Sequence, residues 1–385
     1  MRTAHYWILL LLASIMFSCK QRGKVNSVSA VHCAKQDILP VKYAKGFTVD
    51  YYNGFKIITV RDKSDTTIVL AQYALFAEGK PLPVEFRQAI HVATPVTKLV
   101  CISTNHIAQL SRLGLQDSIA AVANTALVYD RQIIKKIQSG SIVDIGTNEL
   151  NYEKIVSINP AFVITAGNWD GGDKVNLKLS SLGIKSALNL DYMEQDPLAR
   201  VEWIKYMAVF YDKEYEADSI FNEIEKNYLS LKQKVGSITH RPTVFTNMPF
   251  KEIWYMPCGE NYMARLITDA GGDFLWNNEK ATNGLNLNLD YEAVFSKAND
   301  ADFWINTGFA KTLSEIKAAD NKNAFFKAYN TASVYNNDKR QTSEGGFDFW
   351  ESGVVNPDII LADLISIFHP DLLPEHQLYY YRKLK

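Results

Sequence analysis

Two different hydrophobic patterns divide the chain. Between residues 44 and 94, short runs such as FTVDYY and FKIITV are rich in β-branched and aromatic residues, and turn sequences such as Asn53-Gly54 separate them. Such runs are typical of antiparallel strands, so we expect a small β-meander here. From Thr97 onward, short apolar runs alternate with amphipathic helical segments, as in KLVCIS and the helix expected at 105–113. This alternation predicts parallel sheets of the α/β class.

A strongly helical region at residues 197–235 interrupts the α/β pattern. In its second part, from Ala217 to Val235, the apolar residues recur on one helical face. A new run of strands and helices begins after residue 240. We therefore expect two α/β lobes joined by a long helix.

One phrase occurs twice in the chain. LNYEKIVSINPAFVI at 150–164 matches LDYEAVFSKANDADFWI at 289–305, and the two Tyr-Glu pairs are 139 residues apart. Each copy follows a glycine-containing loop late in its own lobe, which favours two related lobes over a chance match of short amphipathic segments. Glu153 and Glu292 occupy the same position in the two copies.

The N-terminus has the pattern of an export signal. Arg2 precedes a largely apolar run of 11 residues at 7–17, WILLLLASIMF, whereas a membrane-spanning helix needs roughly 20. Ser18-Cys19 follows at once and resembles a bacterial lipobox, in which Cys19 becomes the acylated first residue of the mature protein. The alternative is an ordinary secretory signal with an incidental cysteine. We expect a periplasmic protein that is lipid-anchored to a bacterial membrane through Cys19.

Composition narrows the class of protein further. A chain of 385 residues with 47% apolar and 22% charged residues has enough material for a large core and favours two domains over one. A net charge of −1 and the absence of a long Lys/Arg run argue against a nucleic-acid partner. The cysteines that follow the signal, Cys33, Cys101 and Cys258, form no metal-ligand spacing, and Cys101 lies in an apolar run where a buried role is expected.

From Thr97 to its C-terminus, the chain resembles a known family. KLVCISTNHIAQLSRLGLQDSIAAVAN matches the opening of that family, and LNYEKIVSINPAFVI resembles its signature, with Ala161 where an aspartate is common. PDIILADLISIFHPDLLPEHQLYYYRKL resembles the C-terminal helix and tail of its iron-complex members. The family is that of the helical-backbone (class III) substrate-binding proteins of ABC importers, which includes vitamin B12 and iron–siderophore binding proteins.

The resemblance implies two Rossmann-like α/β lobes joined by a single long helix, with a ligand cleft between them. It also implies a partner, an ABC permease with its ATPase. The expected segments are a lipoprotein signal peptide (1–18), a tether (19–43), an N-terminal β extension (44–95), lobe 1 (96–192), linker helices (193–238), lobe 2 (239–345) and a C-terminal helical segment (346–385).

Two interpretations compete for Glu153 and Glu292. Asn151 and Asp290 are good N-caps, so each glutamate lies in a first helical turn, where a carboxylate gains roughly 0.3–1 kcal/mol from the helix dipole. That gain explains each glutamate alone but not the repeated Tyr-Glu pair. In the vitamin B12 binding protein, one glutamate per lobe pairs with permease arginines, and the resemblance assigns this docking role to Glu153 and Glu292. Exposed charge pairs set orientation and association rate more than affinity.

The candidate ligand-binding residues follow predicted strands, because ligands bind at the carboxyl ends of strands in α/β folds. They are Ser103, Thr104, Asn105, His106, Asn168 and Trp169 in lobe 1, and Trp254, Tyr255, Arg340 and Trp350 in the second half. Aromatic side chains suit a large flat or catecholate ligand, and Arg340, Lys339 or Arg265 suits an anionic complex. Ordinary core packing for the aromatics and solvent exposure for the basic residues are the competing interpretations.

Direct metal binding and catalysis find little support in the sequence. Among the histidines, only His106 falls on an expected cleft loop, whereas a zinc or manganese site needs several converging ligands. His106 or Tyr255 remains a candidate axial ligand to haem. No GxSxG, HExxH, P-loop or GxGxxG motif occurs, so we expect no catalytic residues, no metal site and no resident cofactor.

The predicted function is that of a monomeric, lipid-anchored solute-binding protein. It would capture an iron complex (a ferric siderophore or haem) or cobalamin and deliver it to an ABC importer. Two other functions fit the same two-lobed fold: an exported enzyme or chelatase, and a sensor lipoprotein that uses residues 44–94 as its interaction surface.

Overall fold

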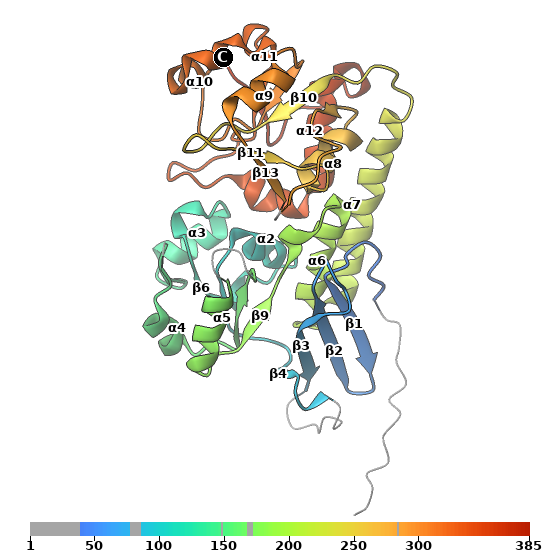
Figure 1. The fold of residues 1–385 in the computed structure, drawn as a ribbon. Coiled ribbons are helices and arrows are strands. Elements are labelled where there is room, and N and C mark those ends of the chain that lie inside the picture. The colour runs from blue at the N-terminus through green and yellow to red at the C-terminus, as the bar shows by residue number, and fades with distance from the viewer. Residues whose placement is uncertain (1–38, 78–85, 148, 168–171, 283–284) are drawn as a thin grey trace, which may run out of the picture.

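The computed structural model describes residues 39–77, 86–147, 149–167, 172–282 and 285–385. It contains two α/β lobes, a helix that runs along both of them, and a four-stranded sheet beside the first lobe (Figure 1). The predicted α/β class and two-lobed architecture are confirmed. The signal peptide, Cys19 and most of the tether lie outside the described residues.

Lobe 1 is built on a five-stranded parallel sheet in the order β7-β6-β5-β8-β9. Its strands are β5 (Leu99–Cys101), β6 (Ile119–Val122), β7 (Val143–Asp144), β8 (Phe162–Thr165) and β9 (Ser186–Leu188). Its helices are α2 (Thr104–Arg112), α3 (Arg131–Gln138), α4 (Tyr152–Ile158) and α5 (Gly172–Ser181), with the 3-10 turns η2 (Gln116–Ser118), η3 (Thr125–Leu127) and η4 (Asp191–Met193). The central strands β5 and β8 are buried along their whole length, as expected of parallel strands covered on both faces. The buried role predicted for Cys101 is confirmed.

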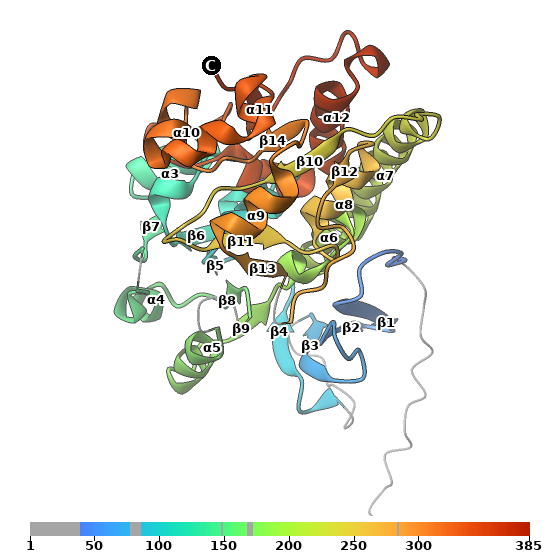
Figure 2. The ribbon, with the colours of Figure 1, turned by 45° about the horizontal axis from the view of Figure 1, so that its top comes forward.

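Lobe 2 repeats this plan with a mixed sheet in the order β12-β10-β14-β15-β16. Its strands are β10 (Thr243–Thr246), β12 (Asp273–Phe274), β14 (Phe303–Ile305), β15 (Val334–Asn336) and the antiparallel edge strand β16 (Arg382–Lys383). A separate antiparallel pair is formed by β11 (Trp254–Pro257) and β13 (Asn286–Leu289). The helices are α8 (Tyr262–Asp269), α9 (Tyr291–Ala298), α10 (Leu313–Ala319), α11 (Lys327–Asn330) and α12 (Pro357–Phe368), with the 3-10 turns η5 (Asn321–Phe325), η6 (Asp348–Trp350), η7 (Ser352–Val355) and η8 (Pro370–Leu372). Figure 2 shows α9, α10 and α11 grouped on one side of this sheet.

Two helices form the connection between the lobes. The predicted long helix is α7 (Glu214–Val235), and α6 (Pro197–Val209) precedes it. Every residue of α6 is buried. Both helices contribute to both cores, since Trp203 and Ala217 pack with lobe 1 whereas Val201 and Phe221 pack with lobe 2.

The N-terminal sheet shares the core of lobe 1. The predicted meander is present as β1 (Phe47–Tyr52), β2 (Phe55–Arg61) and β3 (Val69–Phe76), and β4 (Ile90–Ala93) adds a parallel strand to β3. Apolar residues on one face, such as Ile58 and Tyr73, belong to the same buried cluster as Trp203 and Phe210. The Tyr73 hydroxyl also accepts the N–H of Leu188 at 2.8 Å, so this sheet is joined to β9 as well.

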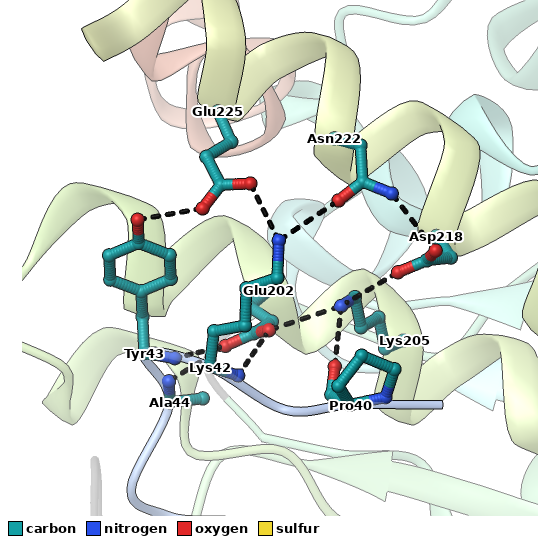
Figure 3. Close-up of polar contacts among 9 residues, drawn as sticks. All are labelled: Pro40, Lys42, Tyr43, Ala44, Glu202, Lys205, Asp218, Asn222 and Glu225. Carbon is teal, nitrogen blue, oxygen red and sulfur yellow. Dashed lines mark hydrogen bonds and ion pairs between the residues drawn. The ribbon is translucent and has the colours of Figure 1, made fainter. Parts of the chain in front are cut away.

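A short segment before β1, residues 40–46, binds across α6 and α7; we call it the strap (Figure 3). The buried carboxylate of Glu202 accepts the backbone N–H groups of Lys42, Tyr43 and Ala44 at 2.8, 2.7 and 2.9 Å. Lys205, which is also fully buried, lies 3.2 Å from Glu202 and donates to the Pro40 carbonyl at 2.7 Å. Buried charges are tolerated only when paired and hydrogen-bonded in this way.

The strap also reaches α7. Lys42 Nζ lies 2.8 Å from Glu225, and the Tyr43 hydroxyl donates to the same carboxylate at 2.7 Å. Lys205 completes the link through Asp218 at 3.1 Å. The strap therefore joins the two connecting helices to each other.

Candidate ligand-binding cleft between the lobes

Loops at the carboxyl ends of the parallel strands bring the two lobes into contact. The Thr104 hydroxyl, at the start of α2, lies 3.4 Å from the carbonyl oxygen of Trp350. Gly346 approaches lobe 1 so closely that a Cβ there would lie 2.6 Å from the carbonyl oxygen of Leu127, in the loop that follows β6. Only glycine permits this approach. Residues 346–350, far from lobe 1 in the sequence, thus form part of the contact between the lobes.

Glu351 joins the lobes through a buried carboxyl group. Its two oxygens accept the N–H groups of Tyr129 and Asp130 at 2.8 and 2.7 Å, next to the N-terminus of α3. Burial raises the pKa of Glu351 to about 8, and the Asp130 and Asp348 carboxylates add to the rise, although the two backbone N–H groups oppose it.

A pocket of about 420 Å³ lies beside this contact. Tyr129 of lobe 1 lines one side, and the other side comes from residues 339–341 and from the tail residues 377–379. Lys339 and Arg340 supply its positive charge. The pocket is therefore suited to an anionic group.

The Arg340 guanidinium is oriented by three neighbours. Its Nε lies 2.5 Å from Asp348, and its central carbon lies 5.2 and 4.2 Å from the ring centres of Tyr129 and Tyr379. Stacking of this kind holds the planar guanidinium in one orientation. No hydrogen bond from its Nη atoms is formed within the described residues, so both remain available as donors to a ligand.

Exposed aromatic residues lie in the second half of the chain, in the loops that follow β10, β14 and β15 and in strand β11. Four of them are Phe250, Tyr255, Phe309 and Trp350, with exposed fractions of 60%, 39%, 84% and 44%. Contiguous exposed apolar patches mark interaction surfaces, whereas single exposed apolar side chains are common on protein surfaces. Phe309 was not among the predicted residues, although it follows a strand as Phe250 does and the same signal could have found it.

Residues 99–340 match the family model described as periplasmic binding protein. The chain belongs to the periplasmic binding protein family. Two curated relatives come from Methanocaldococcus jannaschii. "Uncharacterized lipoprotein MJ0878" is 25% identical over 98% of this chain and 94% of its own length. "Uncharacterized lipoprotein MJ0872" is 29% identical over 70% of this chain and 68% of its own length.

Solved structures share the fold of this binding protein. The periplasmic heme binding protein HutB of Vibrio cholerae aligns with a TM-score of 0.54 and 14% identity, over 71% of this chain and 99% of its own. An ABC transporter substrate-binding protein from Listeria monocytogenes aligns with a TM-score of 0.54 and 15% identity, over 71% of this chain and 99% of its own. These two likenesses show the fold.

Two predicted ligand residues of the binding protein are core residues instead. Trp254 is fully buried and donates its indole N–H to the Thr246 carbonyl at 2.9 Å. It lies in strand β11, where alternate side chains point to opposite faces, so Tyr255 is exposed and Trp254 is not. His106 is 1% exposed within α2, and burial lowers its pKa to about 3, so it is neutral and has no exposed face for a ligand or for haem iron.

Ser103 and Asn105, also predicted as ligand residues, make hydrogen bonds at the N-terminus of α2. The Ser103 side chain caps the helix by accepting the N–H of Asn105 at 3.3 Å. The Asn105 amide in turn lies 3.4 Å from the buried carboxylate of Asp191. Asn168 and Trp169 lie outside the described residues.

The two repeated glutamates are both exposed, each in the first turn of its helix. The predicted caps are present, since Asn151 accepts the N–H of Lys154 at 3.0 Å and Asp290 that of Ala293 at 2.7 Å. Glu292 lies 3.5 Å from Lys322. Within the described residues, Glu153 has no ion pair.

The structure also bears on metal binding and membrane insertion. In the part of the chain that it describes, no group of three or more His, Cys, Asp or Glu side chains is placed to hold a metal ion. Within the same residues, no helix is both long and apolar enough to cross a membrane.

Proposed function

We propose that this periplasmic binding protein is a lipid-anchored receptor for an anionic iron complex (a ferric siderophore or haem) or for cobalamin, and that it delivers this ligand to an ABC permease and its ATPase. The observation that carries the proposal is the Arg340 guanidinium, stacked between Tyr129 of lobe 1 and Tyr379 of the C-terminal tail in an interlobe pocket. An arginine held in this way presents two parallel N–H donors, which match a carboxylate or catecholate edge.

The exposed aromatic residues support a large ligand. Tyr255 and Trp350 are both partly exposed, and flat aromatic faces of this kind could cover a porphyrin, a corrin or a catecholate complex. HutB, which shares the fold, is named for heme binding. Together these observations favour a flat or aromatic ligand that carries negative charge.

The lipid anchor at Cys19 rests on the sequence. A small residue and a cysteine directly follow the apolar run, and a relative that matches 98% of this chain is named a lipoprotein. Acylation would leave the folded domain attached to the membrane through residues 20–38.

The first experiment is a titration of the chain without its first 19 residues. Haem, cobalamin and several ferric siderophores are each added while tryptophan fluorescence is followed. We expect saturable quenching by one class of ligand, with the ligand recovered unchanged. No quenching by any class would contradict the proposal, and conversion of the ligand to a product would favour the enzyme instead.

Arg340→Gln tests the pocket itself. We expect this change to weaken the binding of an anionic ligand by at least about tenfold, because a hydrogen bond to a charged group contributes about 1.5–3 kcal/mol. The matched control is Arg265→Gln, because Arg265 lies on α8, where it pairs with Asp269 at 3.1 Å. Equal losses in the two variants would show that the effect is one of overall charge rather than of the pocket.

A further inference from the structure

The repeated helices α4 and α9 have the same local design but different surroundings. Each begins with an Asx cap and a Tyr-Glu pair, and each buries the residue two positions after the glutamate, Ile155 or Val294. The contacts of the flank that carries Tyr152 and Val156 in α4, or Tyr291 and Phe295 in α9, differ between the lobes.

In lobe 2, the chain itself covers the motif. The Tyr291 hydroxyl donates to the Lys322 carbonyl at 2.7 Å, so η5 is fixed against α9. Lys322 Nζ lies 3.5 Å from the Glu292 carboxylate and 4.5 Å from the centre of the Tyr291 ring. One basic side chain therefore contacts both members of the Tyr-Glu pair.

An aromatic side chain completes this intramolecular contact. Phe326, four residues after Lys322, is fully buried. Its ring centre lies 5.9 Å from that of Tyr291 and 5.3 Å from that of Phe295. The lobe 2 copy of the motif is thus occupied by a basic residue followed by a large apolar residue.

In lobe 1, the corresponding face is an open groove between α4 and α5, which lie side by side in Figures 1 and 2. The groove has a volume of about 570 Å³ and is lined by Tyr152, Glu153, Val156, Ser157, Lys178 and Leu182. Val156, at the position of Phe295, is 47% exposed, and Leu182 is 38% exposed. These apolar side chains have no cover within the described residues.

The groove also contains a carboxylate, that of Glu153, and a nearby lysine, Lys178. Lys178 Nζ lies 6.0 Å from the centre of the Tyr152 ring, which resembles the position of Lys322 over Tyr291. Within the described residues, however, no basic side chain lies within 4.0 Å of Glu153. In lobe 1 a lysine therefore lies over the tyrosine of the Tyr-Glu pair, as in lobe 2, but within the described residues no basic side chain pairs with the glutamate.

We propose that the α4–α5 groove binds a segment of the permease that carries a lysine or arginine and, three or four residues later, a large apolar side chain. The basic side chain pairs with Glu153, and the apolar side chain fills the space between Val156 and Leu182. This inference rests on the proposed function, because it takes the permease to be the partner. It adds to the docking role of Glu153 an apolar contact that lobe 2 cannot offer.

Photocrosslinking in cells that carry the full chain and its transporter tests the groove. The crosslinking residue p-benzoylphenylalanine replaces Val156 or Leu182, and the crosslinked protein is identified by mass spectrometry. The matched control position is Leu177, which lies on the same helix as the groove residue Lys178, is 69% exposed and does not line the groove. We expect an ABC permease subunit from positions 156 and 182 and a much lower yield from position 177, because the crosslinker reacts only with groups in contact with it, within about 4.5 Å.

Crosslinkers at two further positions distinguish a failure of the groove inference from a failure of the docking proposal. Crosslinkers at Lys317 and Lys322 report on lobe 2. If crosslinkers at 317 and 322 reach the permease, but the yields at positions 156 and 182 are no higher than the yield at position 177, the groove inference is wrong and the docking proposal stands. If no position reaches a permease subunit, the proposed function fails as well. Crosslinks from 156 to a second copy of this chain would make the groove a self-association site and would overturn the inference.

Discussion

At the scale of single residues, the contact between the lobes depends on Glu351. Its carboxylate is buried and bonds two N–H groups of lobe 1. Because burial raises its pKa to about 8, from an ordinary value near 4.5, the folded protein holds this proton over a pH range in which the unfolded chain has lost it. The contribution of Glu351 to stability is therefore fully present below about pH 4.5 and decreases as the pH rises through about 8.

Glu351→Gln removes this titration. We expect the melting temperature of the variant to lie below that of the wild type at pH 5, since the Gln amide nitrogen cannot accept the N–H that a carboxyl oxygen accepts. The gap between the two proteins should narrow as the pH rises from 5 to 9, because only the wild type must ionise a buried group. Thermal denaturation at a series of pH values measures this. A gap that stays constant, or widens with pH, would contradict the raised pKa.

Individual side chains were predicted unevenly from the sequence. Tyr255 and Arg340 lie where a ligand could reach them, whereas Trp254 and His106 are buried. Position after a strand predicts that a residue is near the cleft, but not which way its side chain points. In β11 that depends on pairing with β13, where Trp254 is opposite Leu289. A partner so distant in sequence leaves no local periodic signal.

At the scale of elements, the strap depends on one buried carboxylate, that of Glu202. Glu202→Ala would leave three backbone N–H groups and the buried Lys205 ammonium without their common partner. Removing one member of a buried ion pair costs about 3–5 kcal/mol, so we expect a loss of that order in the free energy of unfolding, measured by denaturant titration. Hydrogen exchange should also rise at the amides of Lys42, Tyr43 and Ala44, because their acceptor is gone.

Lys42→Ala is the matched control for the strap. It removes a partly exposed ion pair with Glu225, and such pairs contribute about 0–1 kcal/mol. Its backbone amide still donates to Glu202 and should keep its protection from exchange. Comparable destabilisation by the two variants would show that the strap is held by its surface contacts and not by the buried carboxylate.

Most elements were predictable because their signals are local. The strands β5 and β8 are continuous apolar runs, and α4 and α9 begin at Asx caps. The strap was not predicted, since it is fixed by a carboxylate about 160 residues away. For the tail LYYYRKL the sequence allowed a short helix or an extended segment, and the pairing of residue 383 with residue 335 of β15 decides for the strand β16. Long-range hydrogen bonds of this kind leave no pattern in the segment that they hold.

At the scale of the whole molecule, the N-terminal sheet belongs to lobe 1. The sequence indicated a separate extension, because its alternation of strands differs from the α/β pattern that follows. Its apolar face nevertheless forms one cluster with α6 and the lobe 1 sheet. The strap joins the same sheet to both connecting helices. Lobe 1, the sheet and the connecting helices should therefore unfold together.

The two copies of the internal repeat differ in what surrounds their glutamates, which bears on the proposed docking role. Glu292 already lies 3.5 Å from Lys322, whereas Glu153 has no ion pair within the described residues and lies beside the open groove. We therefore expect Glu153→Ala to reduce the initial rate of ligand uptake in cells more than Glu292→Ala does, with ligand affinity and protein level unchanged in both. Lys322→Ala removes the intramolecular partner of the Glu292 carboxylate. In a chain that carries this change, we expect Glu292→Ala to reduce the uptake rate more than it does in the wild type. Equal losses in both single variants would remove the asymmetry, and full uptake by the double variant at normal protein level would show that neither glutamate docks the permease.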